Sequence, residues 1–161
     1  MRSVRVLGAG VVAAVLVAGG ASGAGAAGAV AVQGPEADLA YHGAAALVSG
    51  EVDLRFTPLN HGPSSVPDAT VRLRWSEPLA DVQDLPDGCA RTEVKAVLCR
   101  VGALAADEVG ERIALRVRLR EAPTEVQLEI DTVWNGGAVD RNHLNDRQCV
   151  LILDTGDAYY F

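Results

Sequence analysis

The 161-residue sequence is poor in the residues on which several classes of protein depend. Lysine occurs once, at Lys95, so the clustered cations that neutralise nucleic-acid phosphates are missing. Aromatic residues make up 4% of the chain, whereas concave ligand sites usually need an apolar and aromatic lining. No Gly-x-Ser-x-Gly motif occurs, and no Gly-rich phosphate loop follows the N-terminal region. We therefore expect a protein that is not an enzyme, has no cofactor and does not bind nucleic acid.

The N-terminal region has the order of a secretory signal peptide: a basic start, a short apolar core and an exit of small residues. Arg2 and Arg5 precede an uncharged apolar run that glycines bracket. We predict a signal peptide over 1–29, a short linker over 30–36 and one folded domain over 37–161. The alternative is a membrane anchor, but the strongly apolar part is shorter than the roughly 20 residues that span a bilayer. The mature protein is expected to be secreted, without attachment to a membrane.

The mature region is strongly acidic. Two of the 14 basic residues lie in the N-terminal region and all 21 acidic residues lie after it, which leaves 12 basic residues and a net charge of −9. A charge of this size favours solubility and says little about the fold.

Alternation of apolar and polar residues with a period of two dominates the mature region and predicts half-buried strands. The clearest segments are 51–57, 69–75, 112–120 and 124–132, and shorter candidates are 37–42, 96–101 and 149–154. No segment has a comparably strong helical pattern. Seven or eight strands separated by turns predict an all-β fold, a single immunoglobulin-like antiparallel β-sandwich. Trp75 and Trp134 both have the parity of inward-facing residues and are expected in the core.

Charged residues on the outer faces predict which strands are neighbours. In an immunoglobulin-like order, Glu51 and Asp53 lie near Arg116 and Arg118, and such opposite-charge pairs support the pairing. The same order makes the segments 69–75 and 124–132 neighbours, and the residues brought together there are Arg72, Arg74, Gln127 and Glu129. The stripe formed by Arg116, Arg118 and Arg120 is either a polyanion site or a solvated face balanced by acidic neighbours, and we favour the second interpretation.

Four segments of the mature region carry a resemblance to a known family. They are "ADL" (37–39), "GEVDLRFTPLNHGPSS" (50–65), the cysteine-containing pair "LPDGC" and "VLCRVGALAADE", and "DRNHLND" (140–146). In this order and spacing they resemble the bacterial domain of unknown function 11 (DUF11), an immunoglobulin-like module of secreted and surface proteins. The resemblance implies a fold and a location, and it implies no reaction and no defined ligand. His61, Cys149 and a last strand rich in Leu and Ile depart from the family pattern.

Cys89 and Cys99 are separated by nine residues. A hairpin can bring two cysteines at this spacing within the Cα separation of 4.4–6.8 Å that is usual for a disulfide. The alternatives are two free thiols or a redox pair, but there is no Cys-x-x-Cys motif. Since an oxidised pair is the ordinary state outside the cell, we expect a structural disulfide.

The last predicted strand is apolar on both faces, which is unusual near a sheet edge. The family register points Val150 and Ile152 inward and Cys149, Leu151 and Leu153 outward. One interpretation is a partner surface, for another protein or for a homodimer with or without an intermolecular disulfide. The alternatives are that the final "DAYYF" or residues 30–36 cover this face, or that Cys149 is a free buried thiol.

The loop "DRNHLND" offers Asp140, Asn142, Asn145 and Asp146 as oxygen donors of the type that calcium binds. Its spacing is not that of an EF-hand, and Asn and Asp are ordinary turn formers, so we favour a structural turn. The three histidines, His42, His61 and His143, have no ligand-like spacing for zinc.

The cluster "NHGPSS" (60–65) lies between two predicted strands. Pro63 fixes φ and lacks an N–H, and Gly62 permits a positive φ, so the cluster is expected to lead the chain from one sheet to the other. The sequence as a whole predicts a secreted, non-enzymatic module with a structural or protein-interaction role. The alternative is a small secreted enzyme or inhibitor with a site on the end loops of the sandwich.

Overall fold

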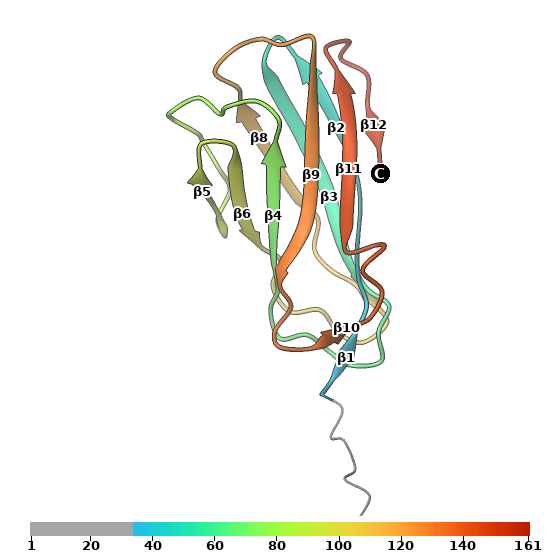
Figure 1. The fold of residues 1–161 in the computed structure, drawn as a ribbon. Coiled ribbons are helices and arrows are strands. Elements are labelled where there is room, and N and C mark those ends of the chain that lie inside the picture. The colour runs from blue at the N-terminus through green and yellow to red at the C-terminus, as the bar shows by residue number, and fades with distance from the viewer. Residues whose placement is uncertain (1–33) are drawn as a thin grey trace, which may run out of the picture. The chain divides into compact units, whose positions relative to one another are not determined.

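The computed structural model describes residues 34–161, so the predicted signal peptide lies outside the described residues. Within them the regular elements are all β-strands (Figure 1). They are β1 (Glu36–Ala37), β2 (Leu39–Val48), β3 (Glu51–Asn60), β4 (Thr70–Trp75), β5 (Cys89–Glu93), β6 (Ala96–Arg100), β7 (Glu108–Val109), β8 (Ile113–Arg118), β9 (Glu125–Trp134), β10 (Val139–Asp140), β11 (Arg147–Leu153) and β12 (Tyr159–Tyr160). None of the described residues forms a helix long and apolar enough to cross a membrane.

The strands form two main sheets that face each other, as Figure 1 shows. One sheet has the order β11-β9-β4-β6-β5, and the other has the order β12-β2-β3-β7 with β8 also paired to β3. A short parallel pair, β1 with β10, lies apart from both. The pairs β3–β8, β4–β9 and β9–β11 are those that an immunoglobulin-like order requires. The predicted all-β sandwich is confirmed.

The predicted charge pairs across β3 and β8 are confirmed. Asp53 is opposite Arg116, and Glu51 is opposite Arg118. Strands β4 and β9 are also neighbours as predicted, but both arginines lie one position further along the outer face than expected. Arg74 is opposite Glu129 and not Gln127. Arg72 is opposite Asp131 and binds it through two hydrogen bonds of 3.1 and 2.8 Å.

Inward-facing residues of both sheets form one hydrophobic core. The largest side chains in it are Trp75, Tyr41 and Phe56, each no more than 1% exposed. Tyr41 and Phe56 contact each other edge to face, with ring centroids 6.1 Å apart. Burying a leucine or phenylalanine side chain stabilises a fold by about 1.5–3 kcal/mol, so the period-two pattern accounts for most of the driving force of this sandwich.

The prediction that Trp134 lies in the core is wrong. Its side chain is 49% exposed, and that of Val133 is 42% exposed. The cause is a bulge, because Thr70 pairs with Trp134 while the next residue, Val71, pairs with Thr132. The extra residue in β9 breaks the alternation at the end of the strand, so parity counted from the middle of β9 no longer holds.

The segment after β3 leads the chain across to β4 in the other sheet, as the sequence predicts. Asn60 anchors the crossover and is 1% exposed. Its Oδ1 accepts hydrogen bonds from the backbone N–H of Gly62 (3.0 Å) and of Asp38 (3.3 Å). Its Nδ2 donates to the carbonyl oxygens of Ser64 (2.8 Å) and Ala105 (3.0 Å). The Asn-Gly-Pro-Ser cluster is therefore structural.

Gly62 has a different role from the one its sequence context suggests. Its φ is not positive. Instead, a Cβ at this position would lie 2.5 Å from the Cα of Ala37, so the glycine permits two segments of backbone to pack closely.

The folded part of the chain begins before the predicted boundary at residue 37. Pro35 accepts a hydrogen bond of 2.8 Å from the N–H of Val139, and Glu36 is the first residue of β1. Both residues belonged to the expected linker over 30–36.

Candidate functional site

The outer face of β11 has the composition that the family register predicts. Val150 is 7% exposed and Ile152 is fully buried, whereas Leu151 is 53% and Leu153 is 37% exposed. Cys149 is a free, exposed cysteine. Three apolar side chains therefore lie in a row on the solvent side of a strand at the edge of its sheet.

The C-terminal segment does not cover this row. Tyr159 and Tyr160, which form β12, pair with β2 of the other sheet (Figure 1). Phe161 also joins that sheet, because it exchanges two backbone hydrogen bonds with Gly43. The alternative in which "DAYYF" covers the outer face of β11 is thus wrong, and residues 30–33 lie outside the described residues.

The backbone of β11 is paired on one side. The N–H of Asp154 donates to Thr124, and Asp146 accepts from Thr132, so the even-numbered residues of the strand point their peptide groups toward β9. In an antiparallel strand the alternate residues point the other way. The peptide groups of Cys149 and Leu151 therefore face outward, and no strand within residues 34–161 pairs with them.

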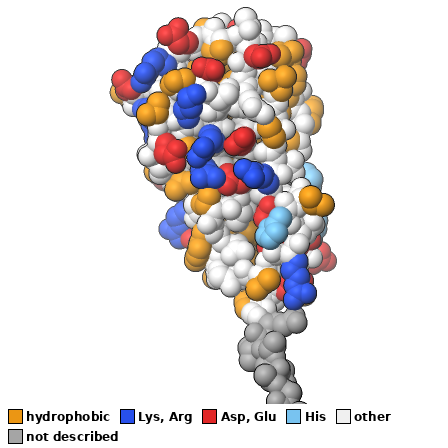
Figure 2. All heavy atoms as spheres, in the orientation of Figure 1, with side chains coloured by type: hydrophobic (Ala, Val, Ile, Leu, Met, Phe, Trp, Pro, Cys, Tyr) orange, Lys and Arg blue, Asp and Glu red, His pale blue; other side chains and the backbone are white. Residues whose placement is uncertain are grey.

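The apolar row is bordered by polar residues. Glu129, Gln127 and Glu125 of β9 lie opposite Cys149, Leu151 and Leu153 respectively. The side-chain amide of Gln127 also donates to the Sγ of Cys149. Figure 2 shows acidic and basic side chains gathered over the middle of this sheet and hydrophobic ones toward the β11 side. The row therefore has a polar boundary along β9.

Two other edges of the sandwich are covered or charged. At the edge of β8, Gln83 accepts a hydrogen bond from the N–H of Arg118 (2.9 Å) and donates to its carbonyl (2.8 Å). At the far edge of the β11 sheet, β5 carries an exposed Glu93 and a half-buried Arg91 that donates hydrogen bonds to the carbonyl oxygens of Glu93 and Ala80. Charge and covering loops are the ordinary protection against edge-to-edge association, and β11 between Cys149 and Leu153 has neither.

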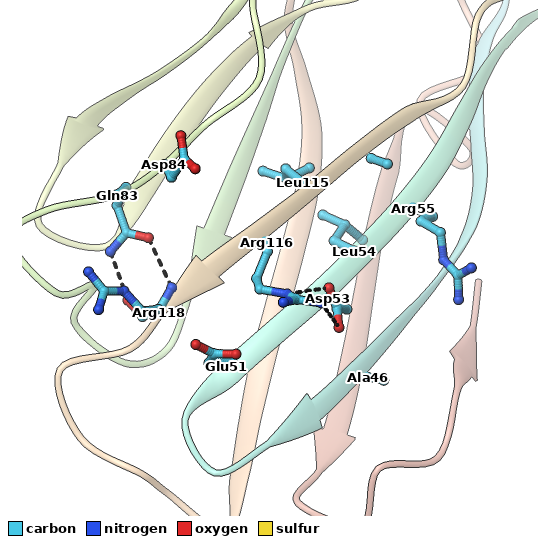
Figure 3. Close-up of a pocket in the computed structure, with 11 residues that line it drawn as sticks. Ala46, Glu51, Asp53, Leu54, Arg55, Gln83, Asp84, Leu115, Arg116 and Arg118 are labelled. Carbon is cyan, nitrogen blue, oxygen red and sulfur yellow. Dashed lines mark hydrogen bonds and ion pairs between the residues drawn. The ribbon is translucent and has the colours of Figure 1, made fainter.

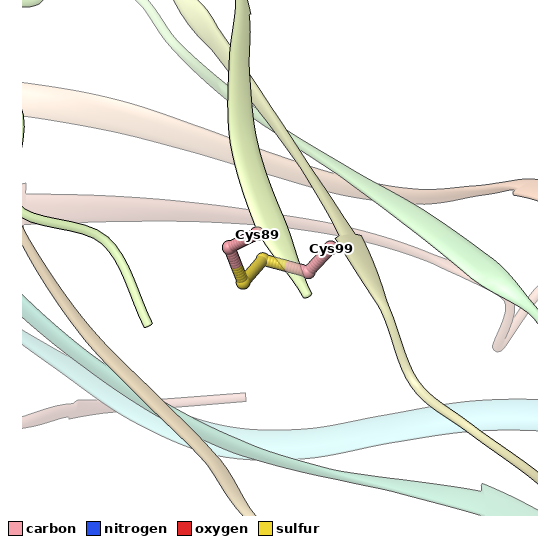
Figure 4. The surroundings of a disulfide bond; sticks show 2 residues. All are labelled: Cys89 and Cys99. Atoms are coloured by element: carbon pink, nitrogen blue, oxygen red, sulfur yellow. A yellow bond between two sulfur atoms is a disulfide. The ribbon is translucent and has the colours of Figure 1, made fainter. Parts of the chain in front are cut away.

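Cys89 and Cys99 form the predicted disulfide (Figure 4). They lie opposite each other in the antiparallel pair β5–β6, with an S–S distance of 2.04 Å and a Cα separation of 4.1 Å. Cys99 is fully buried, and Cys89 packs against the same core. The disulfide fixes the hairpin at the edge opposite to β11, so it is part of the scaffold and not of the apolar row.

Asp140, Asn145 and Asp146 of the loop over 140–146 make side-chain hydrogen bonds, although the buried Oδ1 of Asn145 has no partner within residues 34–161. Asp140 accepts from the N–H of Leu39 and from that of Asn142, both at 2.9 Å. Asn145 donates from its side chain to Asp38 at 2.8 Å. The carboxylate of Asp146 accepts a hydrogen bond of 3.1 Å from the ring of His143. Hydrogen bonding to Asp146 and its charge raise the pKa of His143.

These contacts hold the loop as a turn. Across residues 34–161, no group of three or more His, Cys, Asp and Glu side chains is arranged to hold a metal ion. Asp140 and Asn145 therefore hold the loop against Leu39 of β2 and against the flanking residue Asp38.

A groove of about 630 Å³ lies on the opposite sheet, over β2, β3 and β8 (Figure 3). Small side chains, Ala46 and Ala114, leave the space, and charged side chains border it. Figure 3 shows Arg116 directed at Asp53, which it contacts at 2.8 and 3.1 Å, while Arg55 points away from this pair. Asp53 raises the pKa of Arg116 through this hydrogen bond and its charge.

The arginine stripe on this face is balanced. Arg116 pairs with Asp53, Arg120 contacts Asp81 at 3.2 Å, and Arg118 donates to the carbonyl of Val82 at 3.1 Å. The interpretation of a solvated face with acidic neighbours therefore fits better than a polyanion site. Sequence reasoning missed Gln83, because nothing in the pattern of a loop indicates which of its polar residues reaches a strand edge.

Comparison with protein-family models, with curated proteins and with solved structures gives no match to this chain. The resemblance to DUF11 therefore stays a prediction. The free edge and apolar outer face of β11 are the candidate site that the geometry supports.

Proposed function

We propose that this protein is a secreted, non-enzymatic interaction module of the cell exterior that binds a protein partner through β11. The observation that carries the proposal is the combination of outward-facing peptide groups and apolar side chains at Cys149 and Leu151. A strand added at such an edge gains backbone hydrogen bonds and buries the apolar row at the same time.

The contrast with the other edges supports this assignment. Gln83 covers the edge of β8, and the edge strand β5 is charged, so association is disfavoured there. The row on β11 has leucine at two exposed positions, where a charged residue would disfavour edge pairing.

A location outside the cell is supported by two features. The N-terminal sequence has the order of a signal peptide, and the Cys89–Cys99 disulfide is compatible with an oxidising compartment. The resemblance to DUF11 modules points to the same location.

The alternative, a small secreted enzyme or inhibitor with a site on the end loops, has weaker support. In the groove on the opposite sheet, the carboxylate of Asp53 and the guanidinium of Arg116 are occupied with each other. The loop over 140–146 uses its carboxylates to hold the backbone.

A retention experiment tests the proposal. The mature domain is immobilised, and proteins retained from the native cell surface and medium are compared with those retained by two variants. Leu151→Asp places a charge on the apolar row, whereas the control Val82→Asp changes a 73% exposed valine beside the opposite sheet. We expect a retained protein, which includes further copies of this chain, that Leu151→Asp loses and Val82→Asp keeps. Equal retention by all three forms would show that β11 is not the binding surface.

A further inference from the structure

We propose that the strand added to β11 is β11 of a second copy, running antiparallel about a two-fold axis at Leu151. This inference rests on the proposed function and names its partner. An isologous pair of this kind joins the two β11-containing sheets of two molecules into one continuous sheet.

The backbone permits this pairing in a limited set of registers. The peptide groups that face outward belong to the odd-numbered residues Cys149, Leu151 and Leu153. The carbonyl of Leu153 already accepts a hydrogen bond from Thr155. Antiparallel strands exchange hydrogen bonds between residues that both point toward the partner, so an odd-numbered residue must lie opposite an odd-numbered residue.

The side chains favour one register. With Leu151 opposite Leu151 of the second copy, Cys149 lies opposite Leu153, and each apolar side chain of the row meets an apolar one. Moving the register by two residues in one direction, so that Leu151 faces Cys149, would place Leu153 opposite Arg147. Moving it in the other direction, so that Leu151 faces Leu153, would place Cys149 opposite the polar Thr155. The register centred on Leu151 is therefore the one in which the row is complementary to itself.

The charges at the two ends of β11 favour the antiparallel direction of this pairing. Arg147 then lies opposite Thr155 of the second copy, in the turn that carries Asp157. Across residues 34–161, neither Arg147 nor Asp157 has an ion-pair partner. The antiparallel arrangement brings these opposite charges together twice, once at each end, whereas a parallel arrangement would place like ends side by side.

This register excludes an intermolecular disulfide through Cys149. The two Cys149 residues would be four positions apart along the paired strands, which is about 13 Å at about 3.3 Å per residue. Disulfides need a Cα separation of about 4.4–6.8 Å. The dimer is therefore non-covalent, and Cys149 contributes a small apolar surface opposite Leu153.

Disulfide trapping in the mature protein tests both the pairing and its register. In a Cys149→Ser background, Leu151→Cys puts two thiols directly opposite each other, about 5.5 Å apart at the Cα atoms. The matched control, Leu153→Cys in the same background, leaves its two thiols about 13 Å apart. Both positions are exposed on the same face, so both variants keep the core and the Cys89–Cys99 disulfide.

Under mild oxidation we expect most of the Leu151→Cys protein to run as a dimer on a non-reducing gel and the Leu153→Cys protein to run as a monomer. Equal crosslinking of both variants, or crosslinking of neither, would overturn the proposed pairing. A wild-type protein that is monomeric in sedimentation, yet retains a different protein in a Leu151-dependent way, would overturn this inference and leave the proposed function standing. Loss of all Leu151-dependent retention would overturn both.

Discussion

The hydroxyl groups of Tyr41 and Thr132 lie 2.6 Å apart and join the two sheets through the core. Tyr41 comes from β2 and Thr132 from β9, on opposite sides of the sandwich. Burial raises the pKa of Tyr41 to about 12. The phenol therefore stays protonated at neutral pH, and its hydroxyl is available to bond to the half-buried Thr132.

Removing this hydroxyl should weaken the fold measurably. We expect Tyr41→Phe to lower the free energy of unfolding by about 1 kcal/mol, because the half-buried Thr132 loses its hydrogen-bond partner. Urea unfolding monitored by circular dichroism measures the change. Tyr160→Phe is the control, since Tyr160 is 82% exposed. Equal stabilities of the two variants would contradict a contribution of the Tyr41–Thr132 contact.

Gly62→Ala should be damaging, because Gly62 is buried where two backbone segments pack against each other. The added Cβ would lie 2.5 Å from the Cα of Ala37, so one backbone segment must move. We expect a loss of at least about 2 kcal/mol, toward the upper part of the range for overpacked sites. Gly34→Ala is the matched control, because its Cβ would meet only Val139 at 3.7 Å. If the two alanine variants melt at the same temperature, the close approach at Gly62 is not a constraint.

Reducing the Cys89–Cys99 disulfide should lower the free energy of unfolding of the whole domain and not that of the β11 region alone. The bond closes a loop with a sequence separation of 10, and the chain-entropy model gives about 2–3 kcal/mol for a loop of this size. Urea midpoints with and without reductant measure the loss. The same reductant should leave a Cys89→Ala/Cys99→Ala variant unchanged, and a shift in that variant would assign the effect to another thiol.

The contact between His143 and Asp146 predicts a pH dependence. Because the pKa of His143 is raised in the folded protein, the protonated pair stabilises the fold below the ordinary pKa of histidine, and this contribution disappears as the pH rises through the raised value. NMR titration should give a lower pKa for His143 in Asp146→Asn than in the wild type. An unchanged titration midpoint would show that the contact is not formed in solution.

Several parts of the fold follow from the sequence because they depend on local alternation and on charge. Opposite charges on the outer faces of two strands predict that Asp53 lies opposite Arg116, and this pairing is present in the structure. Trp134 shows where the argument fails, since one extra residue in β9 changes the face on which every later side chain lies. A bulge depends on contacts with the neighbouring strand and leaves no mark in the alternation itself.

The candidate site was predictable in one respect and not in another. The outward direction of Leu151 follows from parity, which the structure confirms. Whether that face is covered depends on where the chain goes after β11, and the short "DAYYF" segment has no pattern that decides between the two sheets. Its association with β2 rests on the pairing of Tyr159 with Ala45 and of Phe161 with Gly43.

Amide hydrogen exchange of individual β11 residues tests the central claim most directly. In the isolated molecule the amides of Val150 and Ile152 are protected by β9, whereas those of Cys149 and Leu151 face outward and should exchange fast. We predict that exchange at Cys149 and Leu151 slows as the protein concentration rises, or as the binding partner is added, while Val150 and Ile152 stay protected throughout. Fast exchange at Cys149 and Leu151 under every such condition would contradict a function of β11 as a pairing edge.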